Sequence, residues 1–284
     1  MTKKNGLIIA TVLIFLITLQ SCSQVINSGN GKLFIIGGGE KSSRLMNELV
    51  DLSGIRKSGY MVILPMASAS PDSSIIWTRA DFDSTGITDM PAFNFRKGEK
   101  PSEARIDSLR NAKLIFIGGG DQEIFMETVR NTPVMDAIIE AWHNGAVISG
   151  TSAGAAVMSS KMITGNQKLY PGVISGYSTI ESGNIEIMNG LGFLKDAIID
   201  QHFVKRQRLN RLISVSIENP DETCIGIDES TAIIVDGNTA TVSGRGQVVV
   251  IKNPMKRKSE KNSLLGTEGL NLSVYLPGER FRIK

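Results

Sequence analysis

The stretch 150–154, with the sequence Gly-Thr-Ser-Ala-Gly, carries the strongest chemical signal in the chain. It follows the apolar run 146–148 and precedes small residues, so it predicts a strand, a sharp turn and a helix. Glycines on both sides of a serine allow a tight turn that exposes the hydroxyl group at the end of the strand. The amide of Ala153 would then begin the helix, where its N–H can stabilise an oxyanion. The pattern predicts that Ser152 is a nucleophile, and a plain Gly/Ser-rich loop is the alternative.

A nucleophilic serine needs a base, and the chain has only two histidines. His143 ends a predicted helix that Gly145 would cap. A cation is favoured at that end of a helix, so a structural role accounts for this residue. His202 instead follows an apolar run and lies among polar residues in the stretch 198–203, at another strand end. It is the stronger candidate for the base, and a surface position is the alternative.

The base in turn needs a carboxylate that fixes its tautomer and stabilises its cation. The candidates are Glu181, Asp200, Asp228 and Glu229, and their spacing does not choose among them. Two of them follow the apolar run 224–227 directly, so either could reach the base. Each of the four could equally be an ordinary surface carboxylate.

Two glycine clusters, 37–39 and 118–120, also follow apolar strands. Backbone N–H groups of glycines can approach a ligand closely, so Gly119 or Gly120 is predicted to be a second oxyanion donor beside Ala153. A tight strand–helix turn is the alternative. Neither cluster has the spacing of a phosphate loop or a dinucleotide turn, so no nucleotide cofactor is expected.

Arg208 and Arg211 lie three residues apart in a predicted helix that follows His202, so they are neighbours on it. Such a pair is usually a solvated face. Close to the candidate base, however, the two guanidinium groups could bind substrate carboxylates bidentately.

The composition limits the classes of function. The net charge of +3 gives no indication of nucleic-acid binding, and 41% hydrophobic residues in 284 suffice for a large core. Only Cys22 and Cys224 are present, which excludes a disulfide framework and a cysteine-based zinc site. Cys224 lies in an apolar stretch and is expected to be a buried core thiol.

The first 21 residues have the pattern of an export signal. Two lysines precede the apolar run 7–19, which is too short to span a bilayer comfortably. The following sequence, Leu-Gln-Ser-Cys, resembles the bacterial lipoprotein signal, which implies cleavage and lipidation at Cys22. We therefore expect a lipid-anchored protein of the cell envelope with a tether at 22–31; an uncleaved short anchor is the alternative.

Apolar strands and helices alternate through the first half of the chain. The predicted strands are 32–36, 60–65, 113–117 and the apolar run 146–148 before the serine turn, with a weaker one at 91–95. This alternation predicts a three-layer α/β sandwich with a mostly parallel central sheet. The carboxyl ends of its strands meet at one edge, which would gather both glycine clusters and Ser152. After residue 223, a hairpin and further strands predict antiparallel elements of the same domain.

Four motifs occur in the order in which cyanophycinases have them, and the chain resembles that family from about residue 32 to residue 251. They are Gly-Gly-Gly-Asp-Gln at 118–122, the serine motif at 150–155, Asp-Gln-His-Phe at 200–203 with three following arginines, and Gly-Ile-Asp-Glu at 226–229. The family shares its fold with peptidase E and, more distantly, with class I glutamine amidotransferases. The resemblance implies this fold for one domain over residues 32–284.

The resemblance also implies the roles of particular residues. Ser152 would be the nucleophile, His202 the base and Glu229 the third member of the triad. The positions that match the family's substrate pocket are Gln122, Asp200, Gln201, Arg206, Arg208 and Arg211.

The implied activity is a serine exopeptidase without a cofactor or metal. It would cleave cyanophycin, an aspartate backbone with arginine on each side chain, through an acyl-enzyme to β-Asp-Arg dipeptides. Two alternatives are a peptidase E-like aspartyl or isoaspartyl dipeptidase and a non-catalytic peptide-binding lipoprotein. A homodimer is left open. Residues 66–95 look more irregular than in the family, and residues 161–190 look longer.

Overall fold

The computed structural model describes residues 30–173 and 177–284. The export signal, Cys22 and residues 22–29 of the tether lie outside the described residues. Within them, no helix is long and apolar enough to cross a membrane.

Seven strands form the main sheet, in the order β15-β10-β9-β1-β4-β3-β2. Its parallel half consists of β1 (Leu33–Ile36), β4 (Val147–Thr151), β3 (Leu114–Ile117) and β2 (Met61–Leu64). Every residue of these strands is buried, as expected for a parallel sheet covered on both faces. The predicted mostly parallel central sheet is confirmed.

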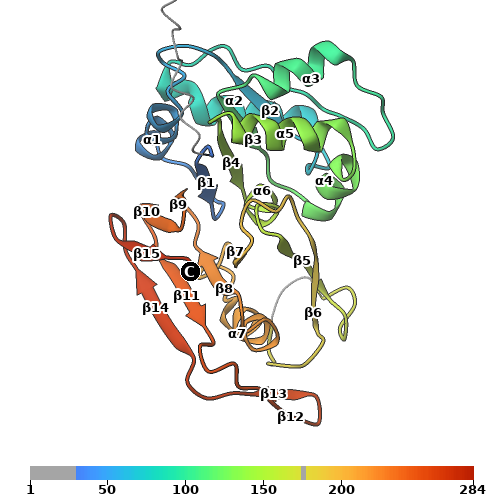
Figure 1. Cartoon of the computed structure of the whole chain (residues 1–284), viewed down its shortest axis with the longest axis vertical. Coiled ribbons are helices and arrows are strands. Elements are labelled where there is room, and N and C mark those ends of the chain that lie inside the picture. The colour runs from blue at the N-terminus through green and yellow to red at the C-terminus, as the bar shows by residue number, and fades with distance from the viewer. Residues whose placement is uncertain (1–29, 174–176) are drawn as a thin grey trace, which may run out of the picture.

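Helices cover both faces of this half. On β1, Leu33 and Ile35 face one apolar core, while Phe34 and Ile36 face another. The first core is closed by α3 (Glu103–Arg110), α4 (Gln122–Val129), α5 (Pro133–His143) and α6 (Ala153–Ala156). The second is closed by α1 (Ser43–Ser53) and α2 (Pro71–Phe82). The result is a three-layer sandwich, with these helices in the upper part of Figure 1.

The antiparallel half of the main sheet comes from the end of the chain, as expected for the hairpin after residue 223. It consists of β9 (Thr231–Asp236), β10 (Thr239–Gly244) and β15 (Arg280–Arg282). Because β9 pairs with β1, the hairpin extends the sheet beside the strand that carries the first glycine cluster.

A second sheet, which the sequence did not predict as a separate unit, has the order β14-β11-β8-β7. It contains β7 (Ala197–Gln201), β8 (Thr223–Ile227), β11 (Val248–Lys252) and β14 (Asn271–Tyr275). Helix α7 (Leu209–Glu218) packs on it through Leu212 and Val215. Both lie in the lower part of Figure 1. The strand before His202 therefore belongs to a different sheet from the strand before Ser152.

One local expectation was wrong: residues 91–95 form no strand and contribute one bridge between Ala92 and Ile63. The region 66–95 contains helix α2 and the short 3-10 helix η1 (Asp83–Thr85). The buried side of α2 holds Ser74, Thr78 and Phe82, so it lacks the apolar periodicity that identifies a helix.

The region 161–190 forms a hairpin of β5 (Lys161–Gln167) and β6 (Ile185–Asn189). The basic stretch 252–263 contains exposed residues and leads into a second small hairpin, β12 (Ser259–Lys261) and β13 (Leu264–Gly266). This hairpin extends from the bottom of the molecule in Figure 1.

Candidate active site

Ser152 occupies the sharp turn between β4 and α6. Its backbone has φ 55° and ψ −112°, a conformation that side-chain-bearing residues rarely adopt. A Cβ atom at Gly150 would lie 2.2 Å from the carbonyl oxygen of Gly154, and one at Gly154 would lie 2.3 Å from that of Ile117. Only glycine fits either position, so the predicted tight turn requires both of them.

His202 connects Ser152 with Glu229. Its Nε2 lies 2.9 Å from Ser152 Oγ, and its Nδ1 lies 2.6 Å from Glu229 Oε1. An ionised carboxylate only accepts hydrogen bonds, so Nδ1 carries the proton and Nε2 is left to accept the serine hydroxyl hydrogen. The side chain of His202 is 9% exposed. The backbone N–H of His202 donates to Gly37 O over 2.7 Å, which ties the end of β7 to the end of β1.

The glycine turn 37–39 forms the wall behind this pair. At Gly38, where φ is +114°, a Cβ atom would lie 2.3 Å from Cε1 of the His202 ring. At Gly39 it would lie 2.7 Å from Cβ of Glu229. The sequence showed three glycines after a buried strand and no reason to connect them with a histidine far along the chain. The structure gives the reason: side chains here would displace the imidazole and the carboxylate.

The surroundings of His202 favour its neutral form. Burial lowers the pKa of the imidazole below its ordinary value of 6.5, and the cation of Arg206 lowers it further. The hydrogen bond that His202 donates to Glu229 acts in the opposite direction and does not overcome burial. At neutral pH the ring is therefore uncharged, which is the form a general base needs.

Glu229 is the one carboxylate among the four candidates that contacts the imidazole in the described structure. Asp228 instead accepts the backbone N–H of Lys205 over 2.9 Å and so fixes the turn after His202. Glu181 accepts the hydroxyl groups of Tyr170 and Thr179.

The fourth candidate, Asp200, is fully buried and paired with arginine. Its carboxylate accepts from Nε of Arg211 at 2.8 Å and also from Nη2 of the same residue. Arg211 further donates to the hydroxyl of Tyr177 over 2.6 Å. Asp200 and Arg211 are absent from the described lining of the cavity beside Ser152. The prediction that these two residues contact substrate does not agree with this geometry. They form an ion pair behind the cavity wall.

Arg208 lies between that ion pair and the cavity. Its Nη1 donates to Gln201 O at 2.6 Å and Gln201 Oε1 at 2.9 Å, with Asp200 Oδ1 at 3.4 Å. It is 6% exposed and Arg211 is 2% exposed, so the pair is not a solvated helix face. Burial, with help from the Arg211 cation, lowers the pKa of Arg208 to about 10. The side chain therefore remains a cation at neutral pH.

A cavity of about 400 Å³ opens beside Ser152, within the size range of ordinary ligand sites. Four of the six predicted pocket residues line it: Gln122, Gln201, Arg206 and Arg208. The remaining wall comes from the start of α4 and from residues 164–167 and 171–173 beyond it. The Nε2 atom of Gln122 donates to Ile163 O over 3.0 Å, which fixes α4 to β5.

The predicted oxyanion donors lie around the serine. A Cβ atom at Gly119 would be 3.3 Å from Cβ of Ser152, so this backbone passes directly beside the nucleophile. Within the described part of the chain, no acceptor takes the N–H of Gly119, Gly120 or Ala153. Unpartnered amides at this point are suited to an oxyanion.

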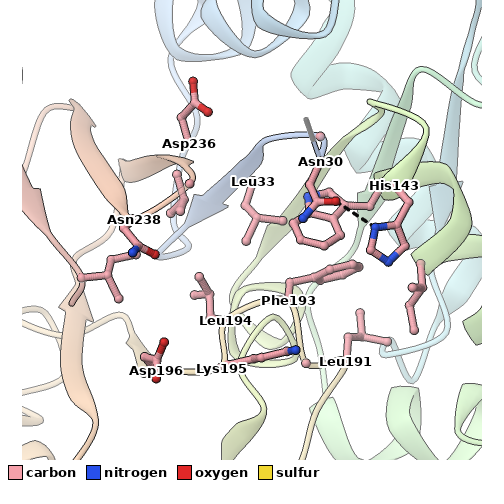
Figure 2. Close-up of a pocket in the computed structure, with 17 residues that line it drawn as sticks. Asn30, Leu33, His143, Leu191, Phe193, Leu194, Lys195, Asp196, Asp236 and Asn238 are labelled. Atoms are coloured by element: carbon pink, nitrogen blue, oxygen red, sulfur yellow. Dashed lines mark hydrogen bonds between the residues drawn. The ribbon is translucent and has the colours of Figure 1, made fainter. Parts of the chain in front are cut away.

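His143 lies elsewhere. It is exposed at the end of α5, and its Nδ1 lies 2.9 Å from Asn30 Oδ1 (Figure 2). It borders a larger cavity, of about 610 Å³, which Leu33 and Phe193 also line. Because Leu33 begins β1 and Gly37 follows its end, this cavity lies at the opposite end of the parallel strands from Ser152. Its lining contains no activated nucleophile, so we do not assign the reaction to it.

Neither cysteine chemistry nor metal binding is supported among the described residues. Cys224 is fully buried, and burial raises the pKa of its thiol, as expected for an inert core residue. Among the described residues, no group of three or more His, Cys, Asp or Glu side chains could hold a metal ion.

A mostly parallel α/β sheet with a serine at a strand–helix turn, facing a histidine, is the arrangement of a serine hydrolase. The fold and the sequence comparisons together make the chain a serine peptidase. It belongs to peptidase family S51, whose sequence profile matches residues 33–243. The resemblance found in the motifs is thereby confirmed.

Individual relatives agree with this assignment. A cyanophycinase of Nostoc sp. is 31% identical over 264 residues, which cover 88% of this chain and 85% of the relative. A peptidase E of Actinobacillus pleuropneumoniae is 26% identical over 162 residues, covering 53% of this chain and 62% of that protein. The crystal structure of a peptidase from an acI-B1 Actinobacterium has a TM-score of 0.67 at 21% identity, covering 90% of this chain and 98% of that one. The last comparison shows that the fold is shared.

Proposed function

We propose that the protein hydrolyses cyanophycin to β-Asp-Arg dipeptides, with Ser152 as nucleophile, His202 as base and Glu229 as orienting acid. The observation that supports the proposal is the pair of hydrogen bonds made by His202. Its Nε2 lies 2.9 Å from Ser152 Oγ, and its Nδ1 lies 2.6 Å from Glu229 Oε1. Similarity to cyanophycinases over most of the chain supports the choice of substrate.

The reaction follows from the proton positions. Nε2 of His202 takes the hydroxyl proton as Ser152 Oγ attacks the carbonyl carbon of a bond between backbone aspartates. The amides of Gly119 and Ala153 hold the oxyanion that forms. The C–N bond then breaks, His202 returns the proton to the leaving amine, and an ester on Ser152 remains. Water, activated by the same imidazole, hydrolyses the ester and frees the serine.

The charge of the cavity suits the substrate. In a β-Asp-Arg unit the arginine is linked through its α-amine, so its α-carboxylate is free. Arg208 is held rigidly by Gln201 and Asp200, and its Nε and Nη2 donate to no acceptor among the described residues. A preorganised guanidinium edge binds a carboxylate bidentately, so Arg208 is the group we assign to this carboxylate, with the exposed Arg206 beside it.

Purified cyanophycin tests the proposal directly. Wild-type protein should release β-Asp-Arg, identified by mass spectrometry, and Ser152→Ala should lose turnover by orders of magnitude. Aspartyl and isoaspartyl dipeptides serve as the second substrate set, because peptidase E relatives exist. Faster cleavage of these dipeptides would favour a peptidase E-like enzyme. Failure of Ser152 to react with a serine-directed probe would favour a non-catalytic binding protein.

We also propose that residues 32–284 act as one peptidase domain and that the mature protein begins at a lipidated Cys22. The support for the anchor is the sequence pattern of residues 1–22 alone. A lipid-anchored enzyme in the cell envelope would act on polymer or isoaspartyl peptides outside the cytoplasm.

A further inference from the structure

The wall of the Ser152 cavity that comes from α4 is acidic. Asp121 and Glu123 both line the cavity, and Glu123 is partly buried. Asn166 joins Glu123 to a further carboxylate on β6: its Nδ2 donates to Glu123 Oε2 over 2.6 Å and to Glu186 Oε2 over 3.1 Å. The other oxygen of Glu123 accepts no hydrogen bond within the described structure.

In the described part of the chain, these carboxylates have no countercharge. Among the described residues, no lysine or arginine nitrogen comes within 4 Å of Asp121, Glu123 or Glu186. One turn further along α4, by contrast, Glu127 pairs with Lys97 at 2.9 Å. Burial raises the pKa of Glu123, and the charge of Asp121 acts in the same direction. The site therefore holds a partly desolvated carboxylate that a cation would stabilise.

The lining of the same cavity also contains positive charge, from Arg206 and Arg208. Arg208 is more than nine-tenths buried and lines the same cavity, and its Nε and Nη2 have no acceptor among the described residues. The cavity lining thus includes a buried cation, Arg208, and a partly buried anion, Glu123, and each has polar atoms with no partner among the described residues. A ligand that carries both charges would satisfy both groups, and a singly charged ligand would leave one of them desolvated and unpaired.

We propose that Glu123 forms a subsite for the cationic side chain of the substrate residue whose carboxylate Arg208 binds. The inference rests on the proposed function, and it assigns the class of side chain: a guanidinium or another cation. An arginine linked through its α-amine offers a free carboxylate at one end and a guanidinium at the other. A carboxylate binds the planar guanidinium through two parallel hydrogen bonds, which selects arginine over an uncharged residue of the same shape.

The variant that tests the subsite is Glu123→Gln, which keeps the shape and an acceptor for Asn166 but removes the charge. Two synthetic β-aspartyl oligomers are compared, one bearing arginine and one bearing citrulline, its uncharged isostere. We expect kcat/KM on the arginine substrate to fall about 10- to 100-fold, the size of one lost charge-assisted contact. On the citrulline substrate it should change less than about threefold. Glu127→Gln, on the same helix but paired with Lys97, is the matched control and should change neither.

A binding measurement separates this inference from the reaction. Calorimetry with Ser152→Ala and with the double variant Ser152→Ala/Glu123→Gln measures affinity for the arginine oligomer without turnover, and we expect the second to bind about 10-fold or more weakly. Equal effects of Glu123→Gln on both oligomers, or none on either, would overturn the subsite. If the wild type cleaves neither oligomer, the proposed peptidase activity fails, while the calorimetry still decides whether Glu123 selects a cation.

Discussion

A methyl group at position 38 tests whether the glycine turn 37–39 positions the base. Gly38→Ala would place Cβ 2.3 Å from Cε1 and 2.5 Å from Nε2 of His202, where ordinary contacts begin at 3.4 Å. The ring must therefore retreat by about 1 Å. The backbone N–H of His202 is bonded to Gly37 O, so the backbone cannot move with the ring. The hydrogen bond of 2.9 Å between Nε2 and Ser152 Oγ would therefore be lost.

A displacement of about 1 Å at a catalytic group lowers the rate by roughly 10²-fold. We expect kcat to fall by about this factor and KM to change little, because Gly38 is absent from the described cavity lining. The alanine must also adopt φ near +114°, which costs about 1–3 kcal/mol of stability. Chemical denaturation measures that second effect separately.

Gly54→Ala is the matched control. Gly54 also has a positive φ, of 71°, but a Cβ atom there would meet nothing within 4 Å. It should therefore show a stability loss of about 1–2 kcal/mol with unchanged kcat. The reasoning is refuted if Gly38→Ala keeps kcat within about threefold of the wild type. It is equally refuted if Gly54→Ala loses as much activity.

Other predictions concern titration, charge and processing. Neutral His202 is the active form, and its pKa lies below 6.5. We therefore expect kcat/KM to be constant near pH 7 and to fall only below pH 6.5. Glu229→Gln removes the contact that raises this pKa; a pH–rate profile should show the acid limb at still lower pH and a much reduced kcat. Arg208→Lys should lower kcat/KM on β-Asp-Arg polymer about 10- to 100-fold in steady-state kinetics. Arg211→Met removes the main partner of the buried Asp200 carboxylate, and it should lower the free energy of unfolding in urea by about 3–5 kcal/mol. Mass spectrometry of the native protein should find acyl chains on Cys22 and no residues 1–21; an intact N-terminus would contradict this.

The sequence alone was sufficient to predict features that are formed by consecutive residues. The parallel strands are continuous apolar runs, and the serine turn is determined by Gly150 and Gly154, whose neighbours leave no room for a Cβ atom. Helix α2 was missed because its buried side is mostly hydroxyl-bearing. The separation of β7 from the main sheet was missed because strand sequences do not encode which strand becomes the neighbour.

The pairing of distant groups could not be obtained from spacing. By spacing alone the four carboxylates were equivalent, and it was the family resemblance that implied Glu229. The three-dimensional positions separate Glu229, which contacts the imidazole, from Asp200, which pairs with Arg211. The arginine pair was ambiguous for the same reason, because a helix face can be solvated or buried depending on what packs against it. Glu123 follows a motif residue directly, and its sequence gave no indication that it would lack a countercharge.

The division of the site between two sheets explains why the turns around it are so restricted. Ser152 follows β4 of the main sheet, whereas His202 follows β7 of the second sheet, so their contact spans the junction between the two. Two backbone hydrogen bonds cross this junction: His202 N–H to Gly37 O at 2.7 Å and Ser230 N–H to Gly38 O at 2.8 Å. Both use the same glycine turn, which therefore holds the base and the residue after its acid partner at once. The distance between nucleophile and base is thus determined by the turn that joins the sheets rather than by either sheet alone.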